Sequence, residues 1–178
     1  EIYKDKKKSK ITLHKKDKIL CAKFRKNHFE GVLDVMNKLT KIVKPKKIFM
    51  GEKDFQQLYL VKNELGKKYK TKVIPCKTIR DKDNVALSSR NLLLNKSNLI
   101  IAAKIYETLV DIKKNTKNKK NIPSFLNLKK KELKNNYKIK IDYLELRNNN
   151  NLKISSTNKN SRLFIAYYLG NVRLIDNI

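Results

Sequence analysis

Two short polar segments of the chain carry side chains suited to holding a polyphosphate. Segment 51–58 (GEKDFQQL) follows the apolar run 48–50 and sets the ammonium of Lys53 beside a glycine turn. Segment 87–91 (LSSRN) places two hydroxyl groups next to a guanidinium, and both kinds of group donate hydrogen bonds to phosphate oxygens. Because a glycine backbone can lie against a flat ligand, the first segment fits a nucleotide base and ribose, and the second fits the phosphates.

Each segment also has a purely structural interpretation when taken alone. Asp54 is a suitable N-cap for a helix, which would leave Lys53 solvated. Ser88 can likewise cap a helix that carries Arg90 on its surface. The presence of both segments favours a ligand site, since strand, turn, polar cluster and helix is the usual layout at the carboxyl edge of a parallel sheet.

Four segments together resemble the pantoate–β-alanine ligase family, the pantothenate synthetases. They are 25–32 (RKNHFEGV), 51–58, 78–91 (TIRDKDNVALSSRN) and 173–177 (RLIDN), in the order and at the spacing of the family. The resemblance covers residues 1–178. It implies membership of the nucleotidylyltransferase superfamily, in which LSSR would be the counterpart of the mobile phosphate loop of class I aminoacyl-tRNA synthetases.

The resemblance implies an α/β fold with two domains. Residues 1–78 would be the C-terminal half of a Rossmann-like, parallel-sheet nucleotide-binding domain, and residues 79–178 a small α+β domain that closes over ATP. Family members begin with a strand, a glycine turn and a His-x-Gly-His motif that contacts the ATP phosphates. Neither His14 nor His28 lies in such a motif. The chain is therefore expected to be the C-terminal portion of the enzyme.

The activity implied is ATP-dependent condensation of pantoate with β-alanine, which yields pantothenate for coenzyme A biosynthesis. The carboxylate of pantoate would attack the α phosphorus of ATP, and the amine of β-alanine would then attack the pantoyl adenylate, with release of pyrophosphate and AMP. Mg²⁺ would bridge phosphate oxygens of ATP. Catalysis of this type relies on positioning and charge neutralisation rather than on a side-chain nucleophile.

The resemblance also assigns roles to the residues of the ATP site. Lys53 would approach the phosphates and offset charge on the leaving pyrophosphate, and Ser88, Ser89 and Arg90 would clamp the β and γ phosphates after loop closure. The adenine and ribose would lie near further residues of the same segments, namely Gly51, Glu52, Asp54, Ile79 and Leu87.

Pantoate would be bound by Gln57, whose amide can both donate and accept hydrogen bonds. Arg25 and His28 would border the acid-binding side. The alternative for Gln57 is a polar helix residue that faces water, and the alternative for His28 is a structural histidine.

The composition fits a globular chain but adds a strong positive charge. Of 178 residues 40% are hydrophobic, and the formal net charge is +28. Lysine supplies 38 of the 44 basic residues, and asparagine and isoleucine are abundant, as an A/T-rich genome tends to encode. This charge attracts nucleic acid nonspecifically, but no aromatic ladder interleaves the lysines and no recognition motif occurs, so no specific nucleic-acid partner is expected.

Neither export nor membrane insertion is indicated, because no apolar run approaches ~20 residues. Cys21 and Cys76 stand far apart without a metal-binding pattern, so we expect reduced thiols, a cytoplasmic location and no protein-held metal. The expected partners are pantoate, β-alanine and ATP, and the complete enzyme is expected to be a homodimer.

Three interpretations follow. The chain is a functional ligase whose upstream part is not included, a noncatalytic remnant or split subunit that acts with a partner chain, or a basic nucleic-acid-binding protein. The pairing of GEKD with LSSR favours the first over the third.

Helix and strand patterns alternate up to about residue 79, as a parallel sheet requires. Strands are predicted at 11–13, 19–22, 48–50 and 71–76, and helices at 31–43 and 54–65. Beyond this point two helices precede paired strands of an α+β domain. The helices are predicted at 98–112 and from 123. The strands are predicted at 139–146, in an alternating pattern, and at 163–169, with polar connections at 113–121 and 148–160.

Two details of this second region are also predicted. The helix at 98–112 presents one broad apolar face of Leu99, Ala102, Ala103, Tyr106, Leu109 and Val110. Asn84 stands where the family has glycine in the turn before LSSR, and asparagine tolerates positive φ.

Overall fold

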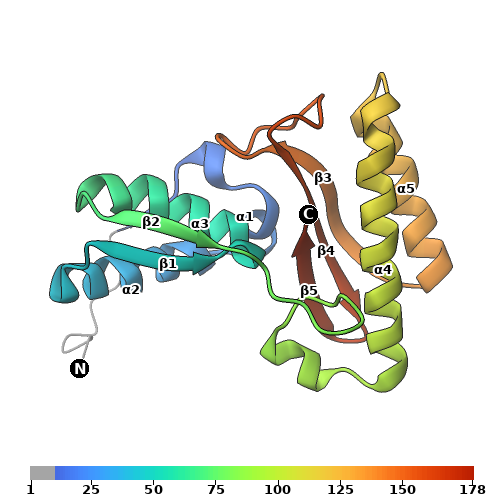
Figure 1. Cartoon of the computed structure of the whole chain (residues 1–178), viewed down its shortest axis with the longest axis horizontal. Coiled ribbons are helices and arrows are strands. Elements are labelled where there is room, and N and C mark those ends of the chain that lie inside the picture. Colours follow the sequence, from blue (N-terminus) through green and yellow to red (C-terminus); the bar gives the residue numbers. More distant parts are fainter. Residues whose placement is uncertain (1–10) are drawn as a thin grey trace. The chain divides into compact units, whose positions relative to one another are not determined.

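The computed structural model describes residues 11–178, and the chain divides into two compact units, Glu1–Lys77 and Thr78–Ile178 (Figure 1). The first unit contains a parallel sheet and the second an antiparallel sheet. At this level the α/β class expected from the sequence is confirmed.

Two parallel strands form the sheet of the first unit. β1 (Lys47–Gly51) pairs with β2 (Lys72–Cys76), so that Gly51 lies opposite Cys76. Parallel neighbours need a crossover connection, which here consists of helix α3 (Phe55–Val61) and the π-helical turn η3 (Lys62–Gly66). A Cβ added to Gly66 would lie 3.2 Å from the carbonyl oxygen of Thr71, so the close return of the chain favours glycine at this position.

The predicted strands at 11–13 and 19–22 are wrong. Residues 11–14 are irregular, the 3-10 helix η1 (Lys15–Asp17) follows, and helix α1 (Leu20–Phe24) occupies the second segment. Short apolar runs do not distinguish a strand from a buried helix by periodicity alone. Helix α2 (His28–Val43) is confirmed, although it begins before the predicted residue 31.

Gln56 of α3 holds the irregular segment in place. Its Nε2 donates to the carbonyl oxygens of Asp17 at 3.2 Å and Ile19 at 2.8 Å, and its Oε1 accepts from the backbone N–H of Cys21 at 3.0 Å. Only 5% of Gln56 is exposed. A buried side-chain amide therefore satisfies backbone groups that the predicted strands would have paired in a sheet.

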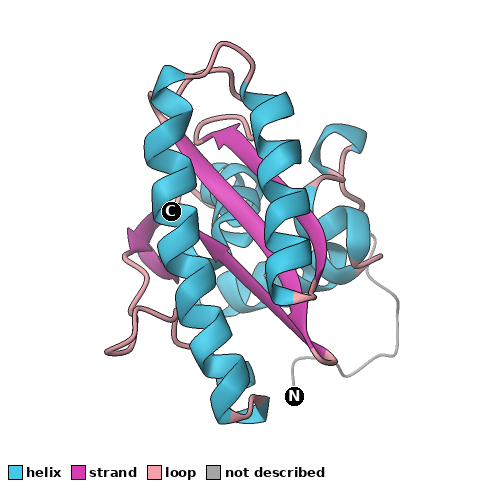
Figure 2. Cartoon of the chain, turned by 90° about the vertical axis from the view of Figure 1, so that its right-hand side faces the viewer, coloured by secondary structure: helices cyan, strands magenta, loops and turns pink. Residues whose placement is uncertain are grey.

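The second unit packs two helices on one face of a three-stranded sheet (Figure 2). The strands β3 (Lys140–Asn148), β4 (Ser161–Leu169) and β5 (Val172–Asn177) are antiparallel in the order β3-β4-β5. The helices are α4 (Lys96–Asn115) and α5 (Ile122–Tyr137), joined by the short 3-10 helix η5 (Thr116–Asn118). The side chains between the layers form one buried core that includes Leu109, Leu163 and Ile165.

Strand positions in this sheet depart from the predicted pattern in two places. The register of β3 against β4 shifts between Ile141 and Tyr143, so Tyr143 and Leu144 are both buried and the expected alternation breaks. Strand β5 was not predicted, because its polar residues Arg173 and Asp176 interrupt the apolar pattern. It follows β4 through a tight turn at Gly170, whose φ of +57° suits glycine.

The buried face of α4 is also rotated relative to the prediction. Ala102 and Leu109 are buried as expected, but Ile105 and Ile112 complete the face, while Val110 is 40% exposed. Apolar residues occur on most sides of this helix, so their spacing alone does not show which face is buried.

Truncation of adjacent residues on α4 tests this packing. Leu109→Ala should lower the free energy of unfolding by about 2–5 kcal/mol, because Leu109 is fully buried (0% exposed) and its removal leaves a cavity. Val110→Ala should change it by less than about 1 kcal/mol. Urea denaturation followed by circular dichroism measures both, and equal effects would contradict the observed face.

A second pair of substitutions tests the anchoring amide. Gln56→Ala should destabilise the first unit by about 1–3 kcal/mol, because the backbone N–H of Cys21 loses its buried acceptor. Gln57→Ala, one residue along the same helix, is the matched control and should have little effect on thermal unfolding. A Gln56→Ala protein as stable as the parent would show that the three hydrogen bonds do not hold this segment.

Candidate functional site

The structure gathers the predicted site residues into two groups, one in each unit. The first begins at the carboxyl end of β1, where Gly51 leads into the 3-10 helix η2 (Glu52–Asp54). A Cβ built on Gly51 would meet no atom within 4 Å, so this stretch of backbone faces open space. A flat ligand can approach it there.

Lys53 and Asp54 form a loose ion pair in this turn. The side chain of Lys53 is 19% exposed, and its Nζ lies 3.9 Å from Oδ2 of Asp54, whose side chain is 54% exposed. A pair of this length and exposure holds the ammonium only weakly.

Asp54 occupies the N-cap position of α3, as its residue type predicted, but without a side-chain capping bond. Its backbone is not helical (φ −96°, ψ 52°), as is usual for a residue that precedes the first helical turn.

Adjacent glutamines of α3 have different surroundings. Gln56 is buried with its amide fully engaged by the backbone, whereas Gln57 is half-buried and makes no hydrogen bond to the other residues that the structure describes. The amide of Gln57 therefore keeps its donor and acceptor capacity for a ligand. The anchoring role of Gln56 was missed from the sequence, because both residues have the same type.

Arg25 and His28 are brought together at the junction of α1 and α2. Arg25 Nη1 donates to His28 Nε2 at 2.7 Å, which places the proton of the neutral ring on Nδ1. The imidazole also packs on Phe29, with ring centroids 4.9 Å apart. This supports the structural interpretation of His28.

The second group lies on a small hairpin at the start of the second unit. The backbone N–H of Leu87 donates to the carbonyl oxygen of Ile79 at 3.0 Å, and Arg80 pairs with Ala86. At the tip, Asp81 Oδ1 accepts from the N–H groups of residues 83 and 85 at 3.0 and 2.8 Å. Asn84 has φ of +64°, as its place in the turn predicted.

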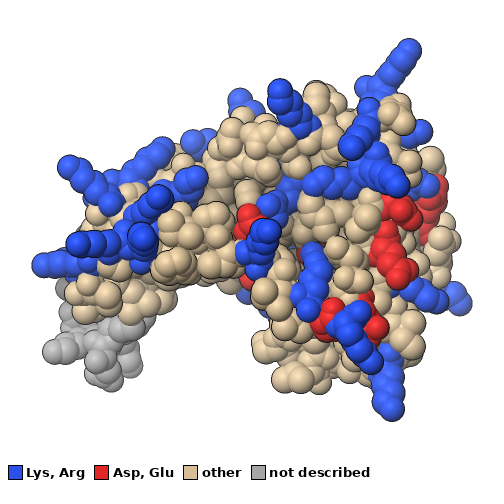
Figure 3. Space-filling model, viewed as in Figure 1, with Lys and Arg blue, Asp and Glu red and all other residues tan. Residues whose placement is uncertain are grey.

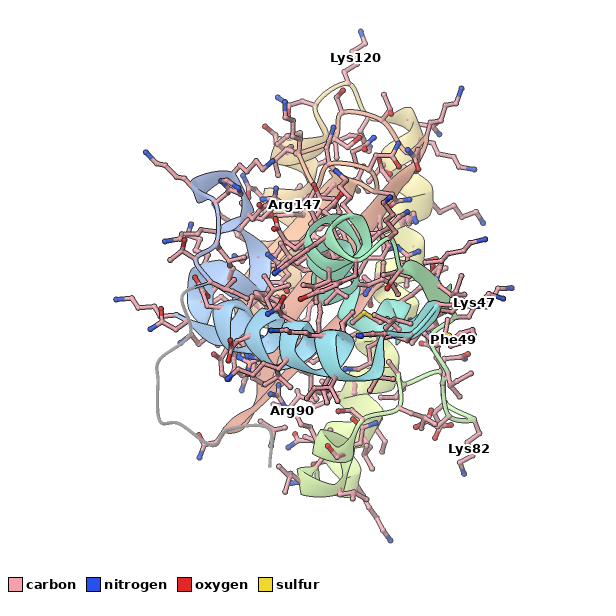
Figure 4. All side chains as sticks on the ribbon, turned by 90° about the vertical axis from the view of Figure 1, so that its left-hand side faces the viewer. Lys47, Phe49, Lys82, Arg90, Lys120 and Arg147 are labelled. Carbon is pink, nitrogen blue, oxygen red and sulfur yellow. The ribbon has the colours of Figure 1, made fainter. Side chains whose placement is uncertain are left out.

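The hairpin carries apolar surface on both arms. Ile79 and Leu87 are 67% and 52% exposed, on the two residues joined by the backbone hydrogen bond. The neighbouring Lys82, at the tip, projects outward (Figure 4). Two large apolar side chains side by side in water suit contact with a flat ring system.

Ser88 and Ser89 differ in their engagement. Ser88 Oγ accepts from the backbone N–H of Arg90 at 3.2 Å and so caps the 3-10 helix η4 (Ser89–Leu93), as the structural interpretation predicted. Its hydroxyl proton remains available for donation. Ser89 is exposed.

Arg90 is held by one nitrogen. Its Nη1 donates to the carbonyl oxygen of Arg173 on β5 at 2.7 Å, and its other guanidinium nitrogens make no hydrogen bond within the described residues. The edge formed by Nε and Nη2 is the one that pairs side-on with carboxylate or phosphate. The plane of the guanidinium is therefore fixed while a bidentate donor edge stays uncommitted.

The structural role of Arg80, at the base of the same hairpin, was not predicted from the sequence. Its Nη1 and Nη2 bond to Oδ2 and Oδ1 of Asp176 at 2.7 and 2.9 Å, and its guanidinium carbon lies 4.1 Å from the ring centroid of Tyr106. Burial by itself would lower the pKa of Arg80, but the hydrogen bond and charge of Asp176 outweigh it and raise the pKa above its usual value. No local pattern signals a partner 96 positions away.

The described residues offer no group of three or more His, Cys, Asp or Glu side chains able to hold a metal ion. In residues 11–178, no helix is both long and apolar enough to cross a bilayer. Lys and Arg are spread over the face of each unit that Figure 3 shows.

Sequence comparisons relate the whole chain to one family. The family model for pantoate-beta-alanine ligase matches residues 1–178. The chain is 37% identical over 163 residues to the pantothenate synthetase of Flavobacterium psychrophilum, covering 88% of this chain and 57% of that protein. It is 33% identical to that of Caldicellulosiruptor bescii, covering 100% of this chain and 64% of the relative. The chain therefore spans less than two thirds of the length of these relatives.

Solved structures agree with this relation. The pantothenate synthetase of Thermus thermophilus matches 99% of this chain and 65% of its own, with a TM-score of 0.88 and 26% identity. The pantoate-beta-alanine ligase of Francisella tularensis, solved with Beta-gamma ATP and Beta-alanine, matches 94% of this chain and 56% of its own, with a TM-score of 0.69 and 34% identity. With the family model matched from the first residue to the last, this chain belongs to the pantoate–β-alanine ligase family.

Proposed function

We propose that this chain is the C-terminal portion of an ATP-dependent ligase that joins pantoate to β-alanine through a pantoyl adenylate. The observation that carries the proposal is the state of the loop at Ser88–Arg90. It offers an exposed hydroxyl at Ser89 and the uncommitted Nε–Nη2 edge of Arg90, and both kinds of group donate to phosphate oxygens. Lys53 of the first unit would supply positive charge for the leaving pyrophosphate.

The Francisella relative supports the nucleotide and the amine. Its structure was solved with Beta-gamma ATP and Beta-alanine, and it matches 94% of this chain. We assign ATP and β-alanine to this chain on that basis, and pantoate on the family's name. ATP would enter as its magnesium complex; the described residues do not fit a protein-held metal, so no step is assigned to the ion.

In the first step, a carboxylate oxygen of pantoate attacks the α phosphorus, and the bond to the β-phosphate oxygen breaks as pyrophosphate leaves. Lys53 offsets charge on the leaving group, and Ser88, Ser89 and Arg90 hold the β and γ phosphates. Gly51, Glu52 and Asp54, with Ile79 and Leu87, border the nucleoside.

In the second step, the amine of β-alanine attacks the acyl carbon, AMP leaves with the electrons of the acyl–oxygen bond, and the nitrogen loses its proton. Gln57 orients pantoate through an amide that no described residue occupies. Arg25 borders the acid side, with His28 fixing its guanidinium at 2.7 Å.

The first unit also supports the assignment of residues 1–78 to an incomplete Rossmann-like domain. Phe49 is 67% exposed and lies beside Lys47 on β1 (Figure 4), and Ile42 and Val43 at the end of α2 are 67% and 66% exposed. Among the described residues β1 pairs only with β2. Further strands and helices of the same domain would cover these apolar groups, whether upstream in the same chain or in a partner chain. Residues 79–178 would then be the lobe that closes over ATP, in a cytoplasmic homodimer.

A fusion protein tests the function directly. This chain should be assayed alone, and also fused to the C-terminal end of the portion of the Thermus thermophilus protein that it does not match. We expect the fusion to catalyse pantoate-dependent exchange of pyrophosphate into ATP and to form pantothenate. Absence of exchange in a folded fusion, under conditions where the intact Thermus thermophilus protein is active, would refute the proposal.

Substitution of Lys53 separates charge stabilisation from folding. In the active protein, Lys53→Ala should lower the rate of adenylate formation about 100-fold or more, because positive charge near the leaving pyrophosphate is lost. Lys62→Ala, an exposed lysine farther along the same helical segment, is the control and should leave the rate nearly unchanged. Both should melt near the parent temperature. Equal pyrophosphate release by Lys53→Ala and parent would refute this role.

A further inference from the structure

We propose that Arg80 and Asp176 form a positioning pair, which fixes the loop 81–90 on strand β5 so that Ser88, Ser89 and Arg90 meet a triphosphate in one geometry. The inference rests on the proposed function only for the identity of the ligand. The positioning itself concerns contacts within the second unit.

All four N–H groups on Nη1 and Nη2 of Arg80 are committed inside the protein. Besides its two bonds to Asp176, Nη1 donates to the carbonyl oxygen of Asn84 at 3.1 Å, at the tip of the hairpin, and Nη2 to that of Asn177 at 3.4 Å. The ring of Tyr106 covers one face of the guanidinium at 4.1 Å. Arg80 therefore keeps no bidentate edge for a phosphate, and its contacts instead join the hairpin tip, helix α4 and strand β5.

A second anchor ties the other end of the loop to the same strand. Arg90 Nη1 donates to the carbonyl oxygen of Arg173, and Arg173 is itself held by Asp142 of β3, with Nε to Oδ2 at 2.9 Å. The side chains of Arg173 and Asp142 are 11% and 3% exposed, so this support is protected from water. Residues 173 and 176 lie about 10 Å apart along an extended strand.

The loop is thus attached to β5 at both ends. Between the anchors, Asp81 closes the tip and the N–H of Leu87 bonds to Ile79. The segment that must meet phosphate, 88–90, follows directly. This arrangement also gives a role to the segment 173–177, which contacts the loop through its backbone at Arg173 and its side chain at Asp176.

The chemistry requires arginine at position 80. Lysine keeps the positive charge but offers a single point donor, so it cannot bond both oxygens of Asp176, reach Asn84 and stack on Tyr106 at once. Asp176 is 8% exposed, and loss of its fork-shaped partner leaves a poorly paired carboxylate in the sheet. The hairpin then loses its hold on β5 while the helices keep their apolar core.

The test compares Arg80→Lys and Asp176→Asn with Arg162→Lys. Arg162 is the matched control, because it is an arginine of β4 whose Nη1 donates to Oδ1 of Asn177, the residue next to Asp176, at 2.7 Å. Amide hydrogen exchange of the full chain should show that protection at Val85 and Leu87 falls about tenfold or more in Arg80→Lys and Asp176→Asn. Arg162→Lys should leave both amides within about twofold of the parent.

A kinetic comparison in the active fusion provides the functional readout. Arg80→Lys should raise KM for ATP about tenfold while KM for pantoate and kcat stay within about threefold, because a mobile loop weakens nucleotide binding. If the parent fusion has no activity, the proposed function fails. The amide hydrogen exchange measurement alone then decides the inference about the Arg80–Asp176 pair. Unchanged protection at Leu87 would overturn it. Protection lost throughout β3–β5 would also overturn it, since the pair would then serve global stability and not the loop.

Discussion

The second unit depends on the requirement that a charge placed in a buried sheet must have a partner. Strand β5 carries Asp176 and Arg173 within a sheet whose inner face is apolar, and each pairs with a charged residue from another element. The partner of Asp176 is Arg80, 96 positions away at the start of the unit. Removing either ion would leave the other uncompensated, so the first and last segments of this unit must meet. This contact also places the hairpin 79–87, which leads directly into the candidate phosphate-binding residues 88–90.

Strongly periodic segments were predictable, because the spacing of apolar residues along the sequence indicates a helix or strand with one buried face. Helices α2, α4 and α5 and strands β1, β2 and β4 belong to this class, and Asn84 was predictable from its tolerance of positive φ. The segment 19–22 was not, since its helical form depends on the amide of Gln56, which lies on another element. Strand β5 was missed for the same reason: its polar residues look exposed until their distant partners are known.

The candidate site shows the same limit at the level of single atoms. The sequence identified the residue types that bind phosphate and amide ligands, but it did not show which hydrogen-bonding groups remain available. Gln56 and Gln57 are identical in type and adjacent, yet the first is consumed by the backbone and the second is not. Ser88 combines its cap with a remaining hydroxyl proton, so the structural and functional interpretations of that residue are compatible.

The proposed ligase uses no side-chain nucleophile, so it needs some residues that fix the site and others that keep donors for the substrate. Rate acceleration by positioning requires groups that are fixed before the substrate arrives and that still have donors to offer. A single residue rarely meets both demands, because the bonds that fix a side chain also use its donors. Arg80 and Gln56 supply the fixing bonds, whereas Ser89 and Gln57 keep their donors. Arg90 combines the two, since one nitrogen binds β5 and the opposite edge stays open. Its function therefore depends on the strand beneath it as much as on its own charge.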